Sequence, residues 1–331
     1  MRGVAKLAAG PGNVAYAERP DVSAGAGEVV VELLAAGICG TDLHIEAGEY
    51  PCAPPVTLGH ELCGRVIELG AGVDAAWAGA RVTAETFSST CGRCRWCRGG
   101  RPSICPERAS LGTHVDGAFA PRIRLPARNL HRVPDALSDV AAAICEPLAC
   151  VCNSLADPAS IAAGDEVLVL GPGAIGLLAA QVARSHGGRV HVRGTAADEQ
   201  RLALAGALGF ETSTVDRPFA GDAPDVVVEC SGAEAAIASA LELAVRGGTL
   251  VQMGLRGAPV TVPFDEICFK ELRVRSGFAA NPSAWERALR LLADGAVELE
   301  PLISGSAELA DFARPFARSR AADGVKFVLV P

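Results

Sequence analysis

The hydrophobic pattern changes character partway along the chain. Over residues 1–135, short stretches that alternate between apolar and polar positions are separated by Gly and Pro. Such stretches are typical of the strands of a small β-barrel or sandwich. The strands that we expect are Glu28–Leu34, Gly64–Leu69, Arg81–Thr83, Phe119–Leu125 and Asn129–Pro134.

From Asp165 onward, short apolar stretches alternate with helical patterns. Apolar strands that alternate with helices predict a parallel sheet covered on both faces, and therefore an α/β fold. The expected strands are Glu166–Leu170, Arg189–Val192, Asp225–Glu229, Thr249–Met253 and Glu271–Ser276, and the expected helices are Ala174–Ser185, Glu199–Leu208 and Ala233–Val245.

The segment between these parts and the end of the chain returns to mixed structure. Ser138–Leu155 predicts a helical connector that is interrupted or restarted at Glu146-Pro147, because proline restricts the residue before it. Beyond residue 280 we expect a helix at Ala284–Asp294, a short helix near Ala307–Ala317 and a last strand at Lys326–Val330.

Length, charge and cysteine content narrow the class of protein. The 331 residues favour two domains, and the net charge of −8 argues against a nucleic-acid partner. The longest apolar run, Val167–Ala183, is too short and too interrupted to span a bilayer, and the N-terminus lacks a signal-peptide core. We therefore expect a soluble, cytoplasmic protein whose 12 cysteines are metal ligands and buried thiols.

The stretch Gly171-Pro172-Gly173-Ala174-Ile175-Gly176 follows an expected strand and opens an expected helix. This is the context that the dinucleotide-binding pattern G-x-G-x-x-G requires. Its glycines allow a tight turn and close packing, and the helix N-terminus attracts a pyrophosphate. We predict contacts to a dinucleotide from Gly171, Gly173, Ile175 and Gly176, in preference to a glycine-rich turn without a ligand.

The end of the second expected strand bears on the choice of cofactor. A chain that binds NAD usually carries an acidic residue about 20 residues after the first glycine. Here Arg193, Gly194 and Thr195 stand at that place. Gly194 leaves room for a 2′-phosphate, Thr195 can donate a hydrogen bond, and Arg193 or Arg201 could supply charge, which favours NADP over NAD. The alternative is that Arg193 points to solvent and Asp198 holds the ribose.

Four cysteines form a compact group in the first part of the chain. Cys91, Cys94, Cys97 and Cys105 have the spacing of a tetrahedral site without an open position, which is typical of structural zinc. Disulfides are disfavoured by the compartment, and an iron–sulfur cluster accepts four thiolates too. A zinc module that contacts nucleic acid through the interleaved arginines is disfavoured by the acidic net charge.

A second set of metal donors lies between Gly37 and Glu61, in GICGTDLHIEAGEYPCAPPVTLGHE. Cys39, His60 and Glu61 offer a sulfur, an imidazole nitrogen and a carboxylate oxygen, a donor set that zinc accepts. Glu146, directly before Pro147 in the connector, is a further candidate. Taken singly, a cysteine is more often a small buried hydrophobe, and an acid at a helix end is more often at the surface.

Taken in order, GICGTDLH, GHE, the four-cysteine group, Glu-Pro and GPGAIG resemble the zinc-containing medium-chain alcohol dehydrogenases over essentially the whole chain. The resemblance implies a GroES-like, β-rich catalytic domain at residues 1–150 and 281–331. It also implies a Rossmann domain with a doubly wound parallel sheet at residues 151–280. A homodimer or homotetramer formed through the Rossmann-domain edges is a further implication.

Within that family the chain is similar to the polyol, sorbitol-type branch, because Glu146 stands where simple-alcohol branches often have a second cysteine. The resemblance implies two zinc ions per chain. One is structural, and the other is catalytic and held by Cys39, His60 and either Glu61 or Glu146. It further implies reversible hydride transfer between NAD(P) and a secondary alcohol of a polyol, sugar alcohol or cyclitol.

The same resemblance implies a proton relay. Thr41 would accept the proton of the substrate hydroxyl, which would pass through the cofactor ribose to His44 and out to solvent; otherwise these residues are a turn residue and a surface histidine. Two other functions remain open. A threonine-type dehydrogenase would share the same ligands, and a nucleotide-binding zinc protein without turnover would use the metal only for structure.

Overall fold

The computed structural model describes residues 1–219, 221 and 223–331. The chain packs into two units, which are described separately. The first consists of residues 1–146, 280–285 and 299–331, and the second of residues 147–279 and 286–298. The division into domains expected from the sequence stays a prediction, although the packing groups residues 286–298 with the second unit. Within the described residues, no helix is long and apolar enough to cross a membrane.

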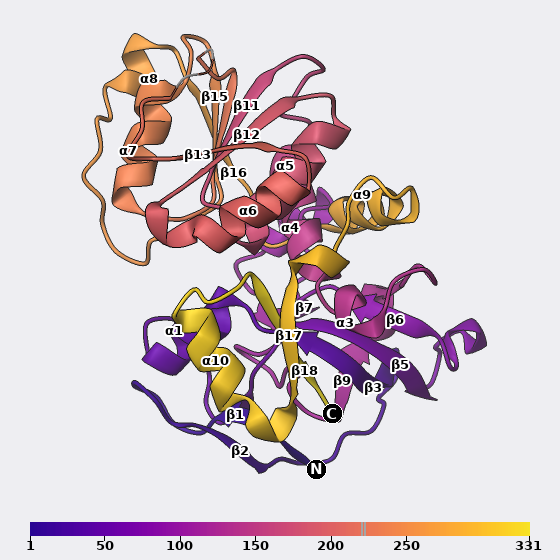
Figure 1. Ribbon diagram of the computed structural model, residues 1–331. Coiled ribbons are helices and arrows are strands. Elements are labelled where there is room, and N and C mark those ends of the chain that lie inside the picture. Colours follow the sequence, from indigo (N-terminus) through magenta and orange to yellow (C-terminus); the bar gives the residue numbers. More distant parts are fainter. Residues whose placement is uncertain (220, 222) are drawn as a thin grey trace. The chain divides into compact units, whose positions relative to one another are not determined.

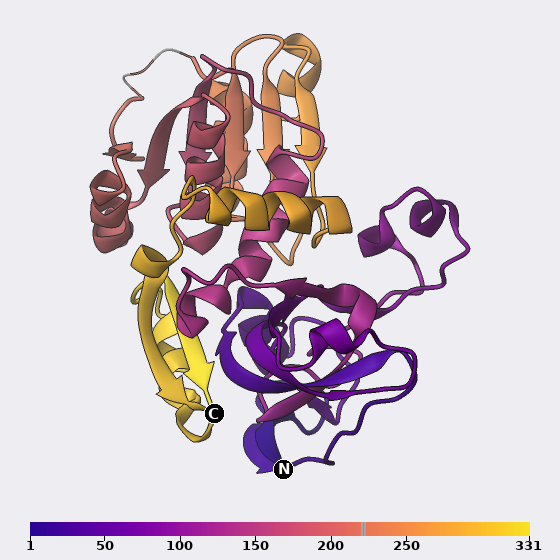
Figure 2. The ribbon, with the colours of Figure 1, turned by 90° about the vertical axis from the view of Figure 1, so that its right-hand side faces the viewer.

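The first unit is built on a mostly antiparallel sheet with the order β10-β6-β5-β3-β18-β17, in which β9 also pairs with β3. Its strands are β3 (Glu28–Gly37), β5 (Glu61–Leu69), β6 (Arg81–Ala84), β9 (Arg122–Pro126), β10 (Leu130–Arg132), β17 (Ile303–Glu308) and β18 (Lys326–Val330). The smaller strands are β1 (Arg2–Lys6), β2 (Val14–Glu18), β4 (Val56–Thr57), β7 (Phe87–Ser89) and β8 (Ala109–Ser110). The helices are α1 (Gly40–Ala47), α2 (Arg95–Arg98), α3 (Asp139–Ala142) and α10 (Ala313–Arg320), and α10 lies against β17 and β18 (Figures 1 and 2).

Strand β3 is central in this sheet. It pairs with β5, β9 and β18 and is apolar along most of its length, as a strand buried on both faces must be. It ends at Gly37, so Cys39 lies directly beyond the strand. The last strand, β18, pairs with β3 at Ala36 and Gly37, which brings the C-terminal end of the chain beside the candidate metal donors.

The second unit contains a parallel sheet with the order β13-β12-β11-β14-β15-β16. Its strands are β11 (Glu166–Leu170), β12 (Arg189–Gly194), β13 (Glu211–Thr214), β14 (Val226–Glu229), β15 (Thr249–Gln252) and β16 (Arg273–Ser276). Its helices are α5 (Ala174–Ser185), α6 (Glu199–Ala207), α7 (Glu234–Leu243) and α8 (Glu266–Phe269), while α4 (Cys145–Leu155) and α9 (Pro282–Ala293) each include the boundary between the units.

The strand order reverses between β11 and β14. Helices α5 and α6 therefore cover one face of the sheet and α7 the other (Figure 1). In open sheets of this kind, ligands bind outside the carboxyl ends of the strands at the point of reversal. The glycine-rich turn at Gly171 lies at that point.

The predicted α/β fold is confirmed, and β11, α5 and β18 have the predicted bounds. The helix expected near Ala307–Ala317 is wrong in its first part, because residues 303–308 form β17 and α10 begins only at Ala313. Strand β17 contains Ser and Gly, and it is a strand because it pairs with β18. Strand β13 was not predicted because its sequence, ETST, is polar and has no apolar pattern. It is a strand because it pairs with β12.

Candidate active site

Cys39 and His60 lie in two segments that a single carboxylate joins. Cys39 follows β3 and caps the N-terminus of α1, and His60 directly precedes β5. Asp42, in the first turn of α1, accepts hydrogen bonds from the backbone N–H groups of Cys39 (2.9 Å) and Gly59 (3.1 Å). Its side chain is fully buried, and burial raises its pKa. Asp42 was not predicted from the sequence, although the third position of a helix is where an acidic capping residue is expected.

Glu61 contributes a buried carboxylate to the same region. A Cβ atom at Gly37 would lie 2.1 Å from Glu61 Oε2, so a glycine is needed there to make room. Glu61 Oε1 lies 2.5 Å from Nζ of Lys326 in a buried ion pair. Glu61 Oε2 is buried and has no hydrogen-bond partner among the described residues. Since an unpaired buried carboxylate oxygen is costly, this atom is suited to binding a cation.

Lys326 supplies a buried positive charge in this region and was not predicted from the sequence. It is the first residue of β18, lies 265 positions from Glu61 along the chain, and is only 6% exposed. Burial alone lowers the pKa of Lys326, but Glu61, Cys39 and Glu146 outweigh it and raise the pKa above its ordinary value. In the metal-free protein the positive charge of this side chain therefore neutralises part of the anionic charge.

The donor atoms fit a zinc ion. One ligand atom from each of Cys39, His60 and Glu61 lies within 4.8 Å of the other two. Sulfur, nitrogen and oxygen donors in this number leave a fourth tetrahedral position open, as catalytic zinc sites do. Glu146 is not a member of that group among the described residues, but it is buried, and its charge acts on both His60 and Lys326.

Zinc binding at this site is expected to strengthen as the pH rises. Burial by itself lowers the pKa of His60, but Cys39, Asp42 and Glu146 outweigh burial and raise it well above its usual value in the metal-free protein. Zinc needs the neutral imidazole, so below that raised pKa each ion that binds must displace a proton. Competition with a chelator, from roughly pH 6 to pH 8, should show an apparent affinity that rises with pH. An affinity independent of pH would contradict the assignment of His60.

Thr41 and His44 lie on α1, one turn apart. The Thr41 hydroxyl oxygen is 3.7 Å from Cys39 Sγ, which places it beside the metal donors. The His44 side chain is 48% exposed, and its Nδ1 lies 2.7 Å from Glu49 Oε2. One group is therefore beside the donors and the other reaches solvent, an order compatible with the predicted relay.

The four cysteines predicted to hold structural zinc are brought together, with one sulfur from each within 4.8 Å of the others. All four are free thiols. Backbone N–H groups donate to three of the sulfurs, those of Cys91, Cys94 and Cys105, at 3.4 Å each. Donation from the backbone N–H groups of Arg93 and Cys94 lowers the pKa of Cys91 to about 7, so this thiol ionises readily. Such a closed set of four sulfurs suits a structural ion.

The glycine-rich turn has the geometry that its sequence predicts. Gly171 has φ +96°, a left-handed conformation that favours glycine, and Gly173 caps the N-terminus of α5. A Cβ atom at Gly176 would lie 1.9 Å from the carbonyl oxygen of Gly171, so the helix could not pack this closely with any other residue. Ile175 is partly exposed in the first turn of the helix.

The residues after β12 are arranged around Asp198. Its Oδ2 accepts hydrogen bonds from the hydroxyl and the backbone N–H of Thr195, and its Oδ1 lies 3.4 Å from Arg201. Gly194 is packed closely against Pro172. The carboxyl edge of the sheet therefore carries one cluster of polar side chains, formed by Thr195, Asp198 and Arg201.

Arg193 is placed differently from both sequence-based expectations. It is buried, and its guanidinium group donates to the backbone carbonyls of Thr214 and Arg217. The prediction that Arg193 could meet a 2′-phosphate is therefore wrong, and so is the alternative that it points to solvent. The reason is the unpredicted strand β13, whose last residue, Thr214, offers one carbonyl, and the turn after it, in which Arg217 offers the other.

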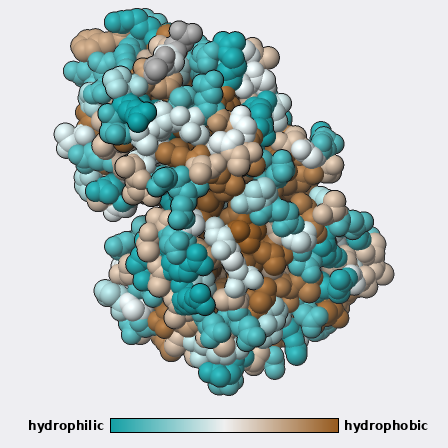
Figure 3. Space-filling view, viewed as in Figure 1, coloured by the Kyte–Doolittle hydropathy of each residue, from teal (hydrophilic) through white to brown (hydrophobic). Residues whose placement is uncertain are grey.

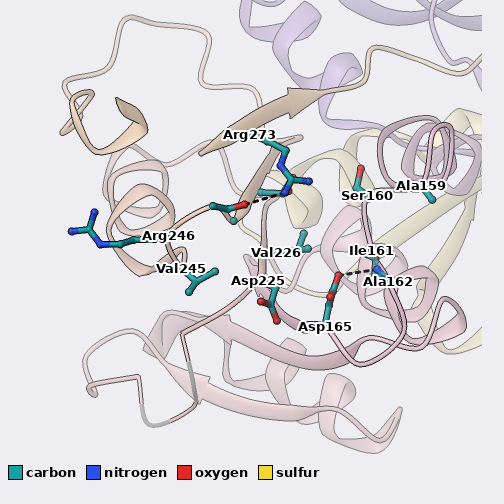
Figure 4. Close-up of a pocket in the computed structure, with 13 residues that line it drawn as sticks. Ala159, Ser160, Ile161, Ala162, Asp165, Asp225, Val226, Val245, Arg246 and Arg273 are labelled. Carbon is teal, nitrogen blue, oxygen red and sulfur yellow. Dashed lines mark hydrogen bonds between the residues drawn. The ribbon is translucent and has the colours of Figure 1, made fainter. Parts of the chain in front are cut away.

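A cavity of about 390 Å³ lies at the opposite edge of the parallel sheet (Figure 4). It is lined by residues at the amino ends of the strands, among them Asp225, Val226 and Arg273. Two of its polar side chains are bonded to the backbone, Asp165 to the N–H of Ala162 and Arg273 to the carbonyl of Gly247. It is therefore separate from the carboxyl edge, where the glycine-rich turn lies.

Comparison with known proteins agrees with this geometry. Residues 25–135 match the family described as Alcohol dehydrogenase GroES-like domain, and residues 174–294 match Zinc-binding dehydrogenase. A sorbitol dehydrogenase from Halalkalibacterium halodurans is 37% identical, covering 100% of this chain and 99% of its own. An L-threonine 3-dehydrogenase from Colwellia psychrerythraea is 32% identical, covering 99% of each chain. The crystal structure of a Sinorhizobium meliloti 1021 protein, described as a zinc-binding dehydrogenase bound to NADP, has a TM-score of 0.90 and 35% identity, covering 100% of this chain and 99% of its own.

The chain belongs to the zinc-containing alcohol dehydrogenase family. Within the family it falls in the polyol-type branch, and it is a zinc-dependent, NAD(P)-linked alcohol dehydrogenase. The predicted family is confirmed, and the alternative of a zinc protein without turnover is not retained.

Proposed function

We propose that this enzyme transfers a hydride between NAD(P) and a secondary alcohol of a polyol, sugar alcohol or cyclitol, reversibly. The observation that carries the proposal is the group of Cys39, His60 and Glu61. Beside it, the buried Glu146 acts on His60 and stands where simple-alcohol branches often have a second cysteine. The 37% sequence identity to a sorbitol dehydrogenase over the full length of this chain supports the same substrate class.

In this proposal Cys39, His60 and a glutamate hold the catalytic zinc. Glu61 is the favoured ligand because its Oε2 is buried and unpaired among the described residues, while Glu146 lies close enough to affect the charge of the site. When bound, zinc supplies Lewis acidity that lowers the pKa of the substrate hydroxyl toward neutrality. The nicotinamide supplies the hydride acceptor.

The protein's own groups move the proton. The Thr41 hydroxyl, which lies 3.7 Å from Cys39 Sγ, would accept the proton that the substrate hydroxyl releases and give up its own proton toward His44. His44 passes the proton to solvent from its half-exposed position, and Glu49 orients the imidazole through its contact with Nδ1. Lys326 holds Glu61 through its other carboxylate oxygen.

A panel of substrates tests the proposed class. We expect kcat/KM to be highest for a polyol, lower for simple secondary alcohols, and lowest for L-threonine, when the production of reduced cofactor is followed by absorbance. A threonine-type activity is the second candidate because of the 32% identical L-threonine 3-dehydrogenase. Faster turnover of L-threonine than of every polyol would replace the first proposal by the second.

We also propose that NADP is preferred over NAD. Positions 194 and 195 hold glycine and threonine and therefore no acidic residue. The nearby Asp198 already accepts a hydrogen bond from Thr195 and forms an ion pair with Arg201. Of the two arginines considered, Arg201, which lies 3.4 Å from Asp198, is the one that would meet a 2′-phosphate. We expect a higher kcat/KM with NADP, and Arg201→Ala should reduce that preference about tenfold, because it removes a charge-assisted hydrogen bond.

Arg189→Ala is the matched control for this measurement. Arg189 begins β12, at the other end of the strand, and pairs with Glu166. Its loss should leave the ratio of kcat/KM values for the two cofactors unchanged. A clear preference of the wild-type enzyme for NAD would contradict the proposed role of Gly194 and Thr195.

We further propose that the enzyme is a homodimer or homotetramer assembled through the β16 edge of the parallel sheet. Among the described strands β16 pairs only with β15, and unpaired edges tend to associate. Large apolar side chains are exposed along this part of the chain, and apolar surface is visible over α8 in Figure 3. These residues are Leu255, Phe264, Phe269, Val274 and Phe278.

Light scattering should therefore give two or four times the chain mass of 33.9 kDa. Phe269→Asp should shift the mass toward that of the single chain, because it places a charge in the apolar surface. Ile67→Asp, which changes an exposed apolar residue of β5 in the first unit, should not. A wild-type protein with the mass of one chain would contradict the proposal.

A further inference from the structure

A fully buried carboxylate stands at the carboxyl end of β14. Glu229 lies in register between Leu170 of β11 and Gln252 of β15. Four donor groups converge on it: the backbone N–H of Ser231 (2.8 Å), the hydroxyl of Ser231 (2.5 Å), the backbone N–H of Gly232 (3.0 and 3.1 Å) and Nε2 of Gln252 (2.6 Å). The role of this residue was not predicted from the sequence.

These four donors suit a carboxylate and not an amide. A carboxylate has two oxygens with about four acceptor sites, whereas an amide has one accepting oxygen and two hydrogens of its own. Glu229 has no ion pair with Lys, Arg or His within the described residues, so these neutral donors are the groups that stabilise its charge. Replacing the carboxylate by the isosteric amide would place donors against donors in a buried region.

The donors on Glu229 belong to the loop that touches the glycine-rich turn. A Cβ atom at Gly171 would lie 2.9 Å from Cβ and 3.1 Å from the backbone nitrogen of Ser231, so Ser231 packs directly against the first glycine of the turn. Ser231 is itself exposed and can be reached by a ligand. The N–H of Cys230 donates to the carbonyl of Leu170 at 2.9 Å, which joins the two loops at their starts.

The loop after β15 is held by the same residue. The backbone N–H groups of Met253 and Gly254 donate to the main-chain carbonyl of Glu229 at 2.8 and 3.0 Å. A Cβ atom at Gly254 would lie 2.6 Å from Glu229 Oε2 and 2.1 Å from the nitrogen of Gly232. The loops that follow β11, β14 and β15 are thus packed together at the edge where sheets of this topology bind their ligands.

We propose that Glu229 is a positioning residue for the dinucleotide cofactor. Its carboxylate holds Ser231 against the turn at Gly171, so that the three loops are already ordered before the cofactor binds. Loops that are ordered in advance spare the ligand the entropic cost of fixing them. The inference rests on the proposed binding of NAD(P) at Gly171–Gly176.

The test is the dissociation constant of NADPH and NADH, measured by fluorescence titration without any alcohol present. Glu229→Gln should weaken binding about tenfold, which corresponds to about 1.4 kcal/mol. It should leave the zinc content and the circular dichroism spectrum unchanged. In the double variant Glu229→Gln/Gln252→Glu, the two residues exchange their side chains, so that an amide again donates to a carboxylate. This variant should recover part of the affinity. Glu234→Gln, the same charge change at an exposed position in the first turn of α7, should have no effect.

A folded Glu229→Gln variant that binds both cofactors as tightly as the wild type would overturn the inference and leave the proposed function intact. Should that variant not fold, Ser231→Ala decides, because it removes one donor and keeps the backbone bonds: weaker binding supports the inference, and unchanged binding overturns it. A wild-type enzyme that binds neither cofactor would overturn the proposed function and this inference together.

Discussion

Replacing Cys39 with alanine is expected to lower the zinc content from the proposed two ions per chain to one and to reduce the proposed polyol oxidation by about 10³-fold or more. Cys39 supplies the sulfur of the donor group formed with His60 and Glu61. Two remaining donors bind zinc poorly, and Lewis-acid stabilisation contributes several kcal/mol, each 1.4 kcal/mol of which is about a factor of ten in rate. Metal analysis and steady-state kinetics on the same preparation check both parts.

Two other cysteine variants complete this experiment. Cys268→Ala changes an exposed cysteine outside both clusters and should keep both ions and full activity. Cys91→Ala should lose the other ion and destabilise the four-cysteine segment, because that ion would bind four thiolates at once. A Cys39→Ala enzyme that retains two zinc ions and normal turnover would show that the catalytic metal is bound elsewhere.

Replacing Thr41 with alanine is expected to slow hydride transfer by about 10² to 10⁴-fold while zinc remains bound. The hydroxyl lies 3.7 Å from Cys39 Sγ, and in the proposed relay it takes the substrate proton. The alanine variant keeps the helix α1 and the capping contact of Asp42, so the metal donors should stay in place. Single-turnover kinetics with a deuterated alcohol would isolate the hydride step.

Thr41→Ser is the matched control, since it keeps the hydroxyl and removes only a methyl group. It should retain most of the rate. Near-wild-type hydride transfer in Thr41→Ala would refute the relay, and equal losses in both variants would indicate a packing effect instead of proton transfer.

The parts of the site that could be predicted are those that adjacent residues encode. His60 and Glu61 are neighbours, the four cysteines have regular spacing, and the turn from Gly171 to Gly176 needs glycines for local reasons. Their chemistry follows from residue type and spacing, and the structure brings each of these groups together.

The parts that could not be predicted depend on contacts between distant segments. Lys326 reaches Glu61 only because β18 pairs beside β3, across 265 positions of sequence. Arg193 is directed inward by the carbonyls at the end of β13, a polar strand without an apolar pattern. Glu229 ends an ordinary apolar strand, and its role is visible only when the neighbouring loops are seen around it.

In the proposed reaction, a nicotinamide cofactor oxidises a polyol at an open zinc site. The most direct measurement is absorbance at 340 nm while polyols are offered to the enzyme, first fully loaded with zinc, then stripped by a chelator, and finally reloaded. We predict oxidation by the loaded enzyme, its loss on stripping and its return on reloading, with two zinc ions per chain in the active form. One zinc ion per chain in the loaded enzyme, with no turnover of any alcohol with either cofactor, would contradict the account.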